Sequence, residues 1–263
     1  MPIRILIAVF GLLAGIFLYL GWSRYEEIWA VYSIPCIIAF AALLSLKPQF
    51  EWWYYKSNPK DIPPGLRRVF EERLPEFYQR KSQNDKLLYR KRVFLTHMGI
   101  AFRGQGFEDD EIPADLTTLI ASQAARVMEH TDQYVLEPFE TVVLYKHPFP
   151  SPAQPKHWHS SEMFEEDGVL LFNLENAIPG ILLPRKHFNI VLYEWFRVAN
   201  RVLGSQHPRI PEGDWRTMLA QMANLPPSWV LEAVGLPEVD GDAVKQVISA
   251  EWASGGEKPV VLH

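Results

Sequence analysis

Cysteine is almost absent from this sequence. The chain of 263 residues contains one cysteine, Cys36, which lies inside an apolar segment. A single cysteine excludes a disulfide within the chain and any metal site built from several thiolates. A strong charge of either sign is also missing, because the formal net charge is −5 and the isoelectric point is about 5.9. This balance gives no reason to expect nucleic acid as a partner.

Charged residues are nearly absent from residues 1–46. Residues 3–22 are apolar apart from Arg4, and residues 28–46 carry no charge. As a helix, each segment of about 20 residues spans about 30 Å, the thickness of the hydrocarbon layer of a bilayer. The short connection between them requires a hairpin. We therefore predict two transmembrane helices and the lipid bilayer as a partner. A cleaved signal peptide is the alternative for the first segment, but no small-x-small cleavage site follows it.

The basic residues near the hairpin indicate its orientation. Arg24 is the one basic residue at the hairpin tip, whereas the outer ends carry Arg4, Lys47, Lys56, Lys60, Arg67 and Arg68. The positive-inside rule then predicts a two-pass protein of the inner (cytoplasmic) membrane, with both termini and the soluble domain in the cytoplasm. Residues 47–62 form an aromatic and basic juxtamembrane linker. Its residues 52–55 are two tryptophans and two tyrosines, which either anchor at the interface or pack on the soluble domain.

Residues 63–263 show mixed helical and strand patterns, so the predicted fold class of this domain is α+β. Apolar residues recur at spacings of three and four, the period of an amphipathic helix, in residues 66–77, 82–98, 116–128 and 187–203. Apolar or β-branched runs predict short strands at residues 141–145, 168–172 and 181–183. Gly104-Gln105-Gly106 predicts a turn, and the prolines after Gly204 limit the rest of the chain to short helices.

One helical stretch carries a resemblance to a known family. Its sequence is Asn189-Ile190-Val191-Leu192-Tyr193-Glu194-Trp195-Phe196-Arg197-Val198-Ala199-Asn200. It resembles the active-site helix of the glucose-regulated zinc metallopeptidases, the family of the Mlc titration factor, where the pattern is Asn-Val-Val-Leu-His-Glu-Phe-Ala-His-x-Leu-Asp. Residues 74–78, 119–124, 141–145 and 169–172 resemble two helices and two strands of the family in the same order. The resemblance covers about residues 63–204 and implies a zincin-like (gluzincin) domain at 63–263.

The zinc-binding histidines of that motif are missing. The two ligand positions, four residues apart on one helix face, hold Tyr193 and Arg197. Tyrosine is a poor zinc ligand because its ordinary pKa is about 10. Arginine has no free lone pair and stays positively charged. Glu194 remains at the position that the resemblance assigns to the general base. We therefore expect no zinc cofactor and a catalytically inactive pseudopeptidase.

Two alternatives remain for the environment of Glu194. Glu194 and Arg197 either form an ordinary surface ion pair three residues apart, or the guanidinium takes the space of the lost metal beside a buried carboxylate. Asn200 stands where the family has an aspartate. The family's third ligand is a glutamate on a later helix; Glu251 is its positional candidate, against an ordinary exposed helix residue.

A displaced metal site is the second possibility. His157 and His159 flank one residue and would point the same way in an extended segment. Together with His147 or His187 they could bind zinc as a cofactor. Two histidines after a proline-rich loop are more often ordinary surface residues.

Two classes of function follow. In the first, the domain is a binding or regulatory module that holds a cytoplasmic protein or peptide segment. The resemblance implies an edge strand beside the active-site helix, formed by Val169, Leu170, Leu171 and Phe172, which would bind extended peptides. In the second, the chain is a divergent zinc-dependent peptidase or hydrolase with a displaced or unconventional site. A purely structural membrane protein remains as a third reading.

Overall fold

The structure is a computed structural model that describes residues 2–24, 27–74, 76–107, 111–151, 157–184, 186–204, 212–223, 236 and 239–251. The chain divides into two compact units, Met1–Asn58 and Pro59–His263. Each unit is considered by itself below.

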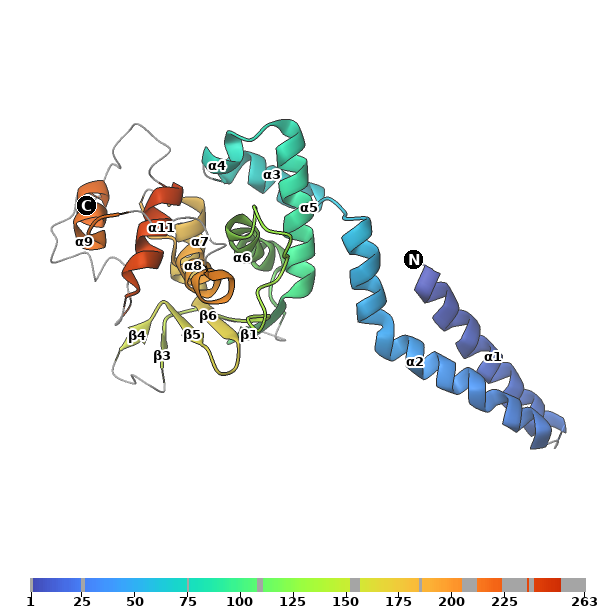
Figure 1. Cartoon of the computed structure of the whole chain (residues 1–263). Helices are drawn as coiled ribbons and strands as arrows, with labels where there is room; N and C mark the ends of the chain where they lie inside the picture. The colour runs from blue at the N-terminus through green and yellow to red at the C-terminus, as the bar shows by residue number, and fades with distance from the viewer. Residues whose placement is uncertain are drawn as a thin grey trace. The chain divides into compact units, whose positions relative to one another are not determined.

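The first unit is a helical hairpin. Helix α1 spans Pro2–Arg24 and helix α2 spans Glu27–Ser57. The two helices pack against each other (Figure 1). Both are long and apolar enough to cross a membrane. Most of their apolar side chains are exposed, including Ile5 at 66% and Leu12 at 67%. Such a surface is unfavourable in water, so it suggests association with lipid.

Helix α2 is longer than the predicted span of residues 28–46. It continues to Ser57, so most of the predicted linker at 47–62, including its aromatic run, is helical. Its 31 residues correspond to about 46 Å at 1.5 Å per residue, which exceeds the thickness of the hydrocarbon layer. Pro35 and Pro48 both lie inside the helix. The C-terminal part of α2 therefore has the length to project beyond a hydrocarbon layer.

The helices of the second unit confirm most of the helical pattern. They are α3 (Pro64–Arg73), α4 (Glu76–Gln79), α5 (Gln83–Gly99), α6 (Ala114–Val127), α7 (Leu174–Leu182), α8 (Ile190–Leu203), α9 (Trp215–Ala223) and α11 (Gly241–Glu251). The helix predicted for residues 66–77 is divided in two. Leu74 ends α3 in an extended conformation, as expected for a residue that precedes a proline. Ser82 caps α5 by accepting a hydrogen bond from the Asp85 amide.

The main sheet has four strands in the order β1-β2-β6-β5. Strands β1 (Ala101–Gln105), β2 (Thr141–Tyr145) and β6 (Val169–Asn173) are parallel, and β5 (Ser161–Phe164) pairs with β6 in the antiparallel sense. Strands β3 (Phe149–Pro150) and β4 (Trp158–His159) form a separate small ribbon. Helices α6, α7 and α8 lie on one side of the main sheet (Figure 1).

The strand register fixes which side chains face these helices. Leu144, Phe172 and Ser161 occupy one row across the sheet, and all three are buried. Their neighbours along each strand point to the opposite face, because side chains alternate in a strand. The row therefore places Ser161, a polar residue, on the core side of the sheet.

Two local predictions were wrong. Gly104 lies inside β1 instead of a turn, and the chain turns at Gly106, whose φ of 78° suits glycine. Ile181 and Leu182 belong to α7 instead of a strand. The start of α7 is fixed by the Asn173 side chain, which accepts a hydrogen bond from the Asn176 amide at 2.9 Å. That cap allows the apolar run to form a helix.

Candidate functional site

Helix α8 carries the motif and lies in the centre of the core. Its N-cap is Asn189, whose side-chain oxygen accepts a hydrogen bond from the Leu192 amide at 3.0 Å. It ends at Gly204, whose φ is positive. Every residue from 190 to 196 is buried, so several faces of this part of the helix are covered by protein. A helix covered in this way belongs to the core of a domain.

The ion pair predicted between Glu194 and Arg197 is present, and its carboxylate is fully buried. The Arg197 Nη1 donates to Glu194 Oε2 at 2.8 Å. The second carboxylate oxygen, Oε1, accepts a hydrogen bond from the Ser161 Oγ at 2.6 Å. Glu194 is 0% exposed, whereas the Arg197 side chain is 27% exposed. An ordinary surface pair is therefore excluded, and both carboxylate oxygens are engaged.

The charges at this site respond to burial and to each other. Burial raises the pKa of Glu194, and the Arg197 charge and the Ser161 hydrogen bond oppose that rise. Burial alone would lower the pKa of Arg197, but the neighbouring Glu194 carboxylate reverses this effect, so the pKa is raised. The two shifts arise from one coupled pair, in which the guanidinium stays charged.

Tyr193 is a structural residue of the same helix. It is 0% exposed, and its hydroxyl oxygen accepts a hydrogen bond from the Asp240 backbone amide at 2.9 Å. The Asp240 carboxylate in turn accepts from the Asp242 and Ala243 amides at the start of α11. Burial raises the pKa of Tyr193 well above its ordinary value, so the phenol stays protonated. A neutral, hydrogen-bonded phenol that joins α8 to α11 is unsuited to bind zinc.

Glu251 lies at a different place from Glu194. Its Oε1 accepts from Arg126 Nη1 at 2.6 Å and from Asn189 Nδ2 at 3.0 Å. The Glu251 side chain is 2% exposed, so the expectation of an ordinary exposed residue was wrong. Within the described part of the chain, the two carboxylates share no hydrogen-bond partner. Asn200, at the family's aspartate position, exchanges two amide hydrogen bonds with Gln246.

The four histidines are not brought together as a metal site. His147 Nδ1 lies 2.6 Å from Glu175 Oε1 at the surface. His157 and His187 are exposed, whereas His159 is buried. The Nε2 of His159 has no hydrogen-bond partner within the described residues. No group of three or more His, Cys, Asp or Glu side chains that could hold a metal ion occurs in the described part of the chain.

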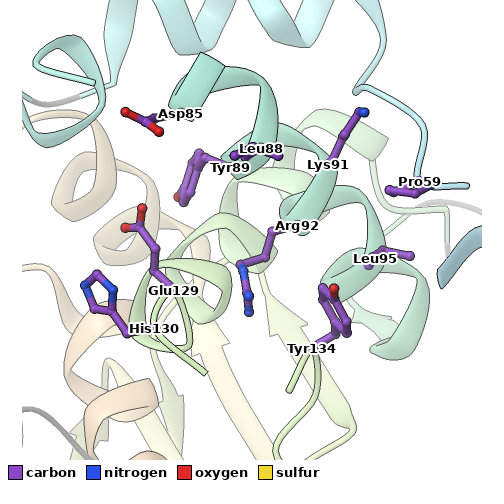
Figure 2. Close-up of a pocket in the computed structure, with 10 residues that line it drawn as sticks. All are labelled: Pro59, Asp85, Leu88, Tyr89, Lys91, Arg92, Leu95, Glu129, His130 and Tyr134. Carbon is purple, nitrogen blue, oxygen red and sulfur yellow. The ribbon is translucent and has the colours of Figure 1, made fainter. Parts of the chain in front are cut away.

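A hollow lies elsewhere in the second unit. It has a volume of about 420 Å³ and is lined by Pro59, Asp85, Leu88, Tyr89, Lys91, Arg92, Leu95, Glu129, His130 and Tyr134 (Figure 2). Arg92 extends from α5 and donates to the carbonyls of Met128, Thr131 and Gln133, each at 2.8 Å. Its guanidinium thereby satisfies backbone acceptors just after α6. This pocket contains no residue of the α8 site.

The edge strand of the sheet differs from the prediction. Residues Val169–Asn173 (β6) lie between β2 and β5, so Val169–Phe172 cannot be an edge. The edge beside α8 is β5. The Asn173 amide donates to the Ser160 carbonyl at 3.0 Å, and hydrogen-bonded pairs alternate along an antiparallel ladder. Glu162 and Phe164 therefore direct their backbone groups to β6, while Ser161 and Met163 direct theirs away from it. Ser161 is 1% exposed, so other parts of the protein cover the strand at that point.

Sequence reasoning missed Ser161 and Asp240. Ser161 contacts Glu194 across 33 residues of sequence, which no local pattern reveals. The segment Asp240-Gly241-Asp242 has the composition of a helix start, so the cap at α11 was visible in principle. The contact between Asp240 and Tyr193 could not be predicted, because the two residues are 47 positions apart.

Comparison with protein families, with curated proteins and with solved structures found no match at a significant level.

Proposed function

We propose that this chain is a two-pass membrane protein whose cytoplasmic domain is a zincin-like pseudopeptidase, a peptide-binding or regulatory module without catalysis. The observation that carries the proposal is the Arg197–Glu194 pair, with its 2.8 Å contact and a carboxylate that is 0% exposed. The positions that would hold zinc in a peptidase of this type are occupied by groups that already have protein partners.

The chemistry of the pair argues against hydrolysis at this site. A general base must reach the proton that it removes, within hydrogen-bond distance of the attacking water. Glu194 has no exposed surface, and its two oxygens accept from Ser161 and Arg197. The Arg197 charge also repels a divalent cation at short range. We infer that the site keeps the helix of a peptidase and has lost its reaction.

The outermost position of β5 in the described sheet supports a binding role. Met163 is partly exposed and its backbone groups are not used by β6, whereas Ser161 is 1% exposed. An extended peptide adds to an edge strand through main-chain hydrogen bonds. The same Ser161 holds Glu194. The edge strand and the motif helix are therefore in contact inside the domain.

Zinc content and hydrolysis test the absence of catalysis. The full-length protein in detergent is equilibrated with excess zinc, desalted and analysed for metal, and its hydrolysis of an unstructured protein such as casein is measured. We expect less than about 0.1 zinc per chain and no cleavage above a buffer control. About one zinc per chain together with cleavage would overturn the proposal.

A zinc-dependent hydrolase with a displaced site is the second candidate, and one observation favours it. The His159 Nε2 is buried and has no hydrogen-bond partner among the described residues, as expected for a ligand atom. If zinc binds, H159A should abolish binding, whereas H187A, at an exposed histidine, should leave it unchanged. Zinc binding that survives H159A would exclude this second site.

A further inference from the structure

The helical hairpin of the first unit contains a hollow that the proposed function does not use. It has a volume of about 230 Å³ and lies between the start of α1 and the second half of α2. Ile3 and Leu6 line it from α1, and Leu43 and Phe50 line it from α2. Pro48 lies inside α2 between these last two residues, and Figure 1 shows that α2 bends along its length. A proline in a helix interior removes a backbone hydrogen bond and bends the helix, which explains why the two helices leave a space here.

Two charged groups meet at this hollow without forming a hydrogen bond. Glu51 lines it, and its Oε1 lies 3.8 Å from the Nε of Arg4, which exceeds hydrogen-bond distance. This Oε1 is buried and has no hydrogen-bond partner among the residues that the structure describes. The Arg4 side chain is 69% exposed, whereas that of Glu51 is 21% exposed. The hollow therefore offers an accessible cation and a buried acceptor oxygen that lacks a donor.

The position of this pair along the hairpin matches the headgroup layer of a bilayer. Arg4 lies at the start of α1, and Glu51 lies five residues after the uncharged segment 28–46. Five residues of helix span about 7 Å, so Glu51 projects just beyond the hydrocarbon layer if segment 28–46 crosses it. Trp53 and Tyr54 line the same hollow, and these two residue types gather at the interface between hydrocarbon and water. In a membrane, the pair would therefore meet lipid headgroups.

A lipid fits the hollow better than a partner helix does. A helix is about 10 Å across, so one turn of it needs roughly 400 Å³, more than the hollow provides. An anionic headgroup would pair with Arg4 but leave the Glu51 oxygen without a donor, and a choline headgroup has no N–H to donate. A phosphoethanolamine headgroup carries both a phosphate and an ammonium with three N–H donors. It therefore complements both charges of the pair.

We propose that this hollow binds one phospholipid with a primary-amine headgroup, whose phosphate pairs with Arg4 and whose ammonium donates to the Oε1 of Glu51. The apolar side chains of Ile3, Leu6 and Leu43 contact the first part of an acyl chain. The inference rests on the proposed two-pass membrane anchor and names a lipid partner for it. It does not depend on what the soluble domain binds.

Lipid titrations followed by native mass spectrometry test this inference. The full-length protein is purified in detergent, stripped of lipid, and titrated with phospholipids of identical acyl chains that carry phosphoethanolamine, its N,N-dimethyl form, phosphocholine or phosphoglycerol. We expect one phosphoethanolamine lipid per chain, bound about tenfold more tightly than the phosphocholine and phosphoglycerol lipids, with the dimethyl form between them. Glu51→Gln should remove this preference, and Arg4→Gln should weaken the binding of every phospholipid. R24Q and E27Q, at the hairpin tip, are matched controls that should leave the preference unchanged.

The outcomes separate the lipid site from the membrane anchor. Carbonate extraction of membranes that contain the full-length protein shows whether it is integral, and release into the soluble fraction would overturn both proposals. Retention in the membrane with equal affinity for the four lipids, with a preference for phosphoglycerol, or with a phosphoethanolamine preference that survives in E51Q, would overturn the lipid inference alone. Circular dichroism shows whether each variant keeps its helical structure. If E51Q does not fold, the methylated series on the wild type decides the question, and equal binding of the phosphoethanolamine and phosphocholine lipids refutes the inference.

Discussion

Two glutamate–arginine ion pairs lie along α8, one beside its N-cap residue Asn189 and one in its middle, and they are held in different ways. Glu251 and Arg126 come from α11 and α6, and their side chains are 2% and 8% exposed. Glu194 and Arg197 are neighbours on α8, where the carboxylate is 0% and the guanidinium 27% exposed. The first pair joins elements that are far apart in sequence, whereas the second lies within one helix.

The partners of each arginine explain the difference. Arg126 also donates to the Ala250 carbonyl at 2.7 Å and lies 3.7 Å from the centre of the Phe77 ring. Its guanidinium is enclosed on several sides, so this pair fixes α11 to the body of the domain. Among the described residues, Arg197 makes one hydrogen bond, and 27% of its side chain is exposed. A pair of this second kind leaves a charge accessible, which a binding site requires and a purely structural contact does not.

The largest effect should follow from breaking the enclosed pair. Arg126→Ala leaves the Glu251 carboxylate buried with only the Asn189 amide as a partner. Loss of one member of a buried pair typically costs about 3–5 kcal/mol. For a unit of this size, that corresponds to a fall in Tm of about 10 °C. Thermal unfolding followed by near-ultraviolet circular dichroism measures it. Arg201→Ala, which breaks an exposed pair, should change the free energy of unfolding by less than about 1 kcal/mol.

Arg197→Ala should destabilise the domain less than Arg126→Ala, by about 1–3 kcal/mol. Glu194 loses its ionic partner but keeps the Ser161 hydrogen bond, and it can take up a proton because burial already raises its pKa. Chemical unfolding at neutral pH gives the difference. A loss as large as that of Arg126→Ala would show that the exposed flank of Arg197 does not lessen its structural role, and the contrast between the two pairs would fail.

Ser161→Ala should cost about 1–2 kcal/mol, because a hydrogen bond to a buried carboxylate is lost. The same measurement on Ser23→Ala, whose hydroxyl is exposed, supplies the control. A double-mutant cycle with Arg197→Ala tests the connection between the strand and the pair. Independent, additive losses would indicate that Ser161 and Arg197 do not act on the same carboxylate.

Local patterns predicted most of the helices and two strands of this fold, at residues 141–145 and 168–172, because their signals are local. The run Thr141–Tyr145 is rich in β-branched residues, and β2 has those bounds. Asn189 and Gly204 mark the ends of α8. In contrast, β1 contains alanine, arginine and glycine, residues with little strand preference, and its place depends on pairing with β2. Strand order was also beyond local reasoning, which is why β6 was mistaken for an edge.

In the candidate site too, local contacts could be predicted from the sequence and long-range contacts could not. Helical spacing alone predicted the contact between Glu194 and Arg197. Burial of the carboxylate, its bond to Ser161 and the anchoring of Tyr193 by Asp240 depend on how the sheet and α11 pack against α8. The environment of Glu251 could not be predicted either, because its partners lie 125 and 62 residues away.

The smallest effect concerns pH and distinguishes burial from pairing at Glu194. The pKa of Glu194 is raised in the folded protein, above an ordinary value of about 4.3. A carboxyl group with a raised folded-state pKa stabilises the fold fully below its unfolded-state pKa, and this contribution is lost as the pH rises through the folded-state pKa. Glu194→Gln removes the titration. We therefore expect the free energy of unfolding of the wild type, relative to E194Q, to fall between pH 4 and pH 8. The slope should be shallow, because Arg197 and Ser161 oppose the effect of burial. A relative stability that rises with pH would mean that the ion pair outweighs burial and that Glu194 is held as a carboxylate at every pH tested.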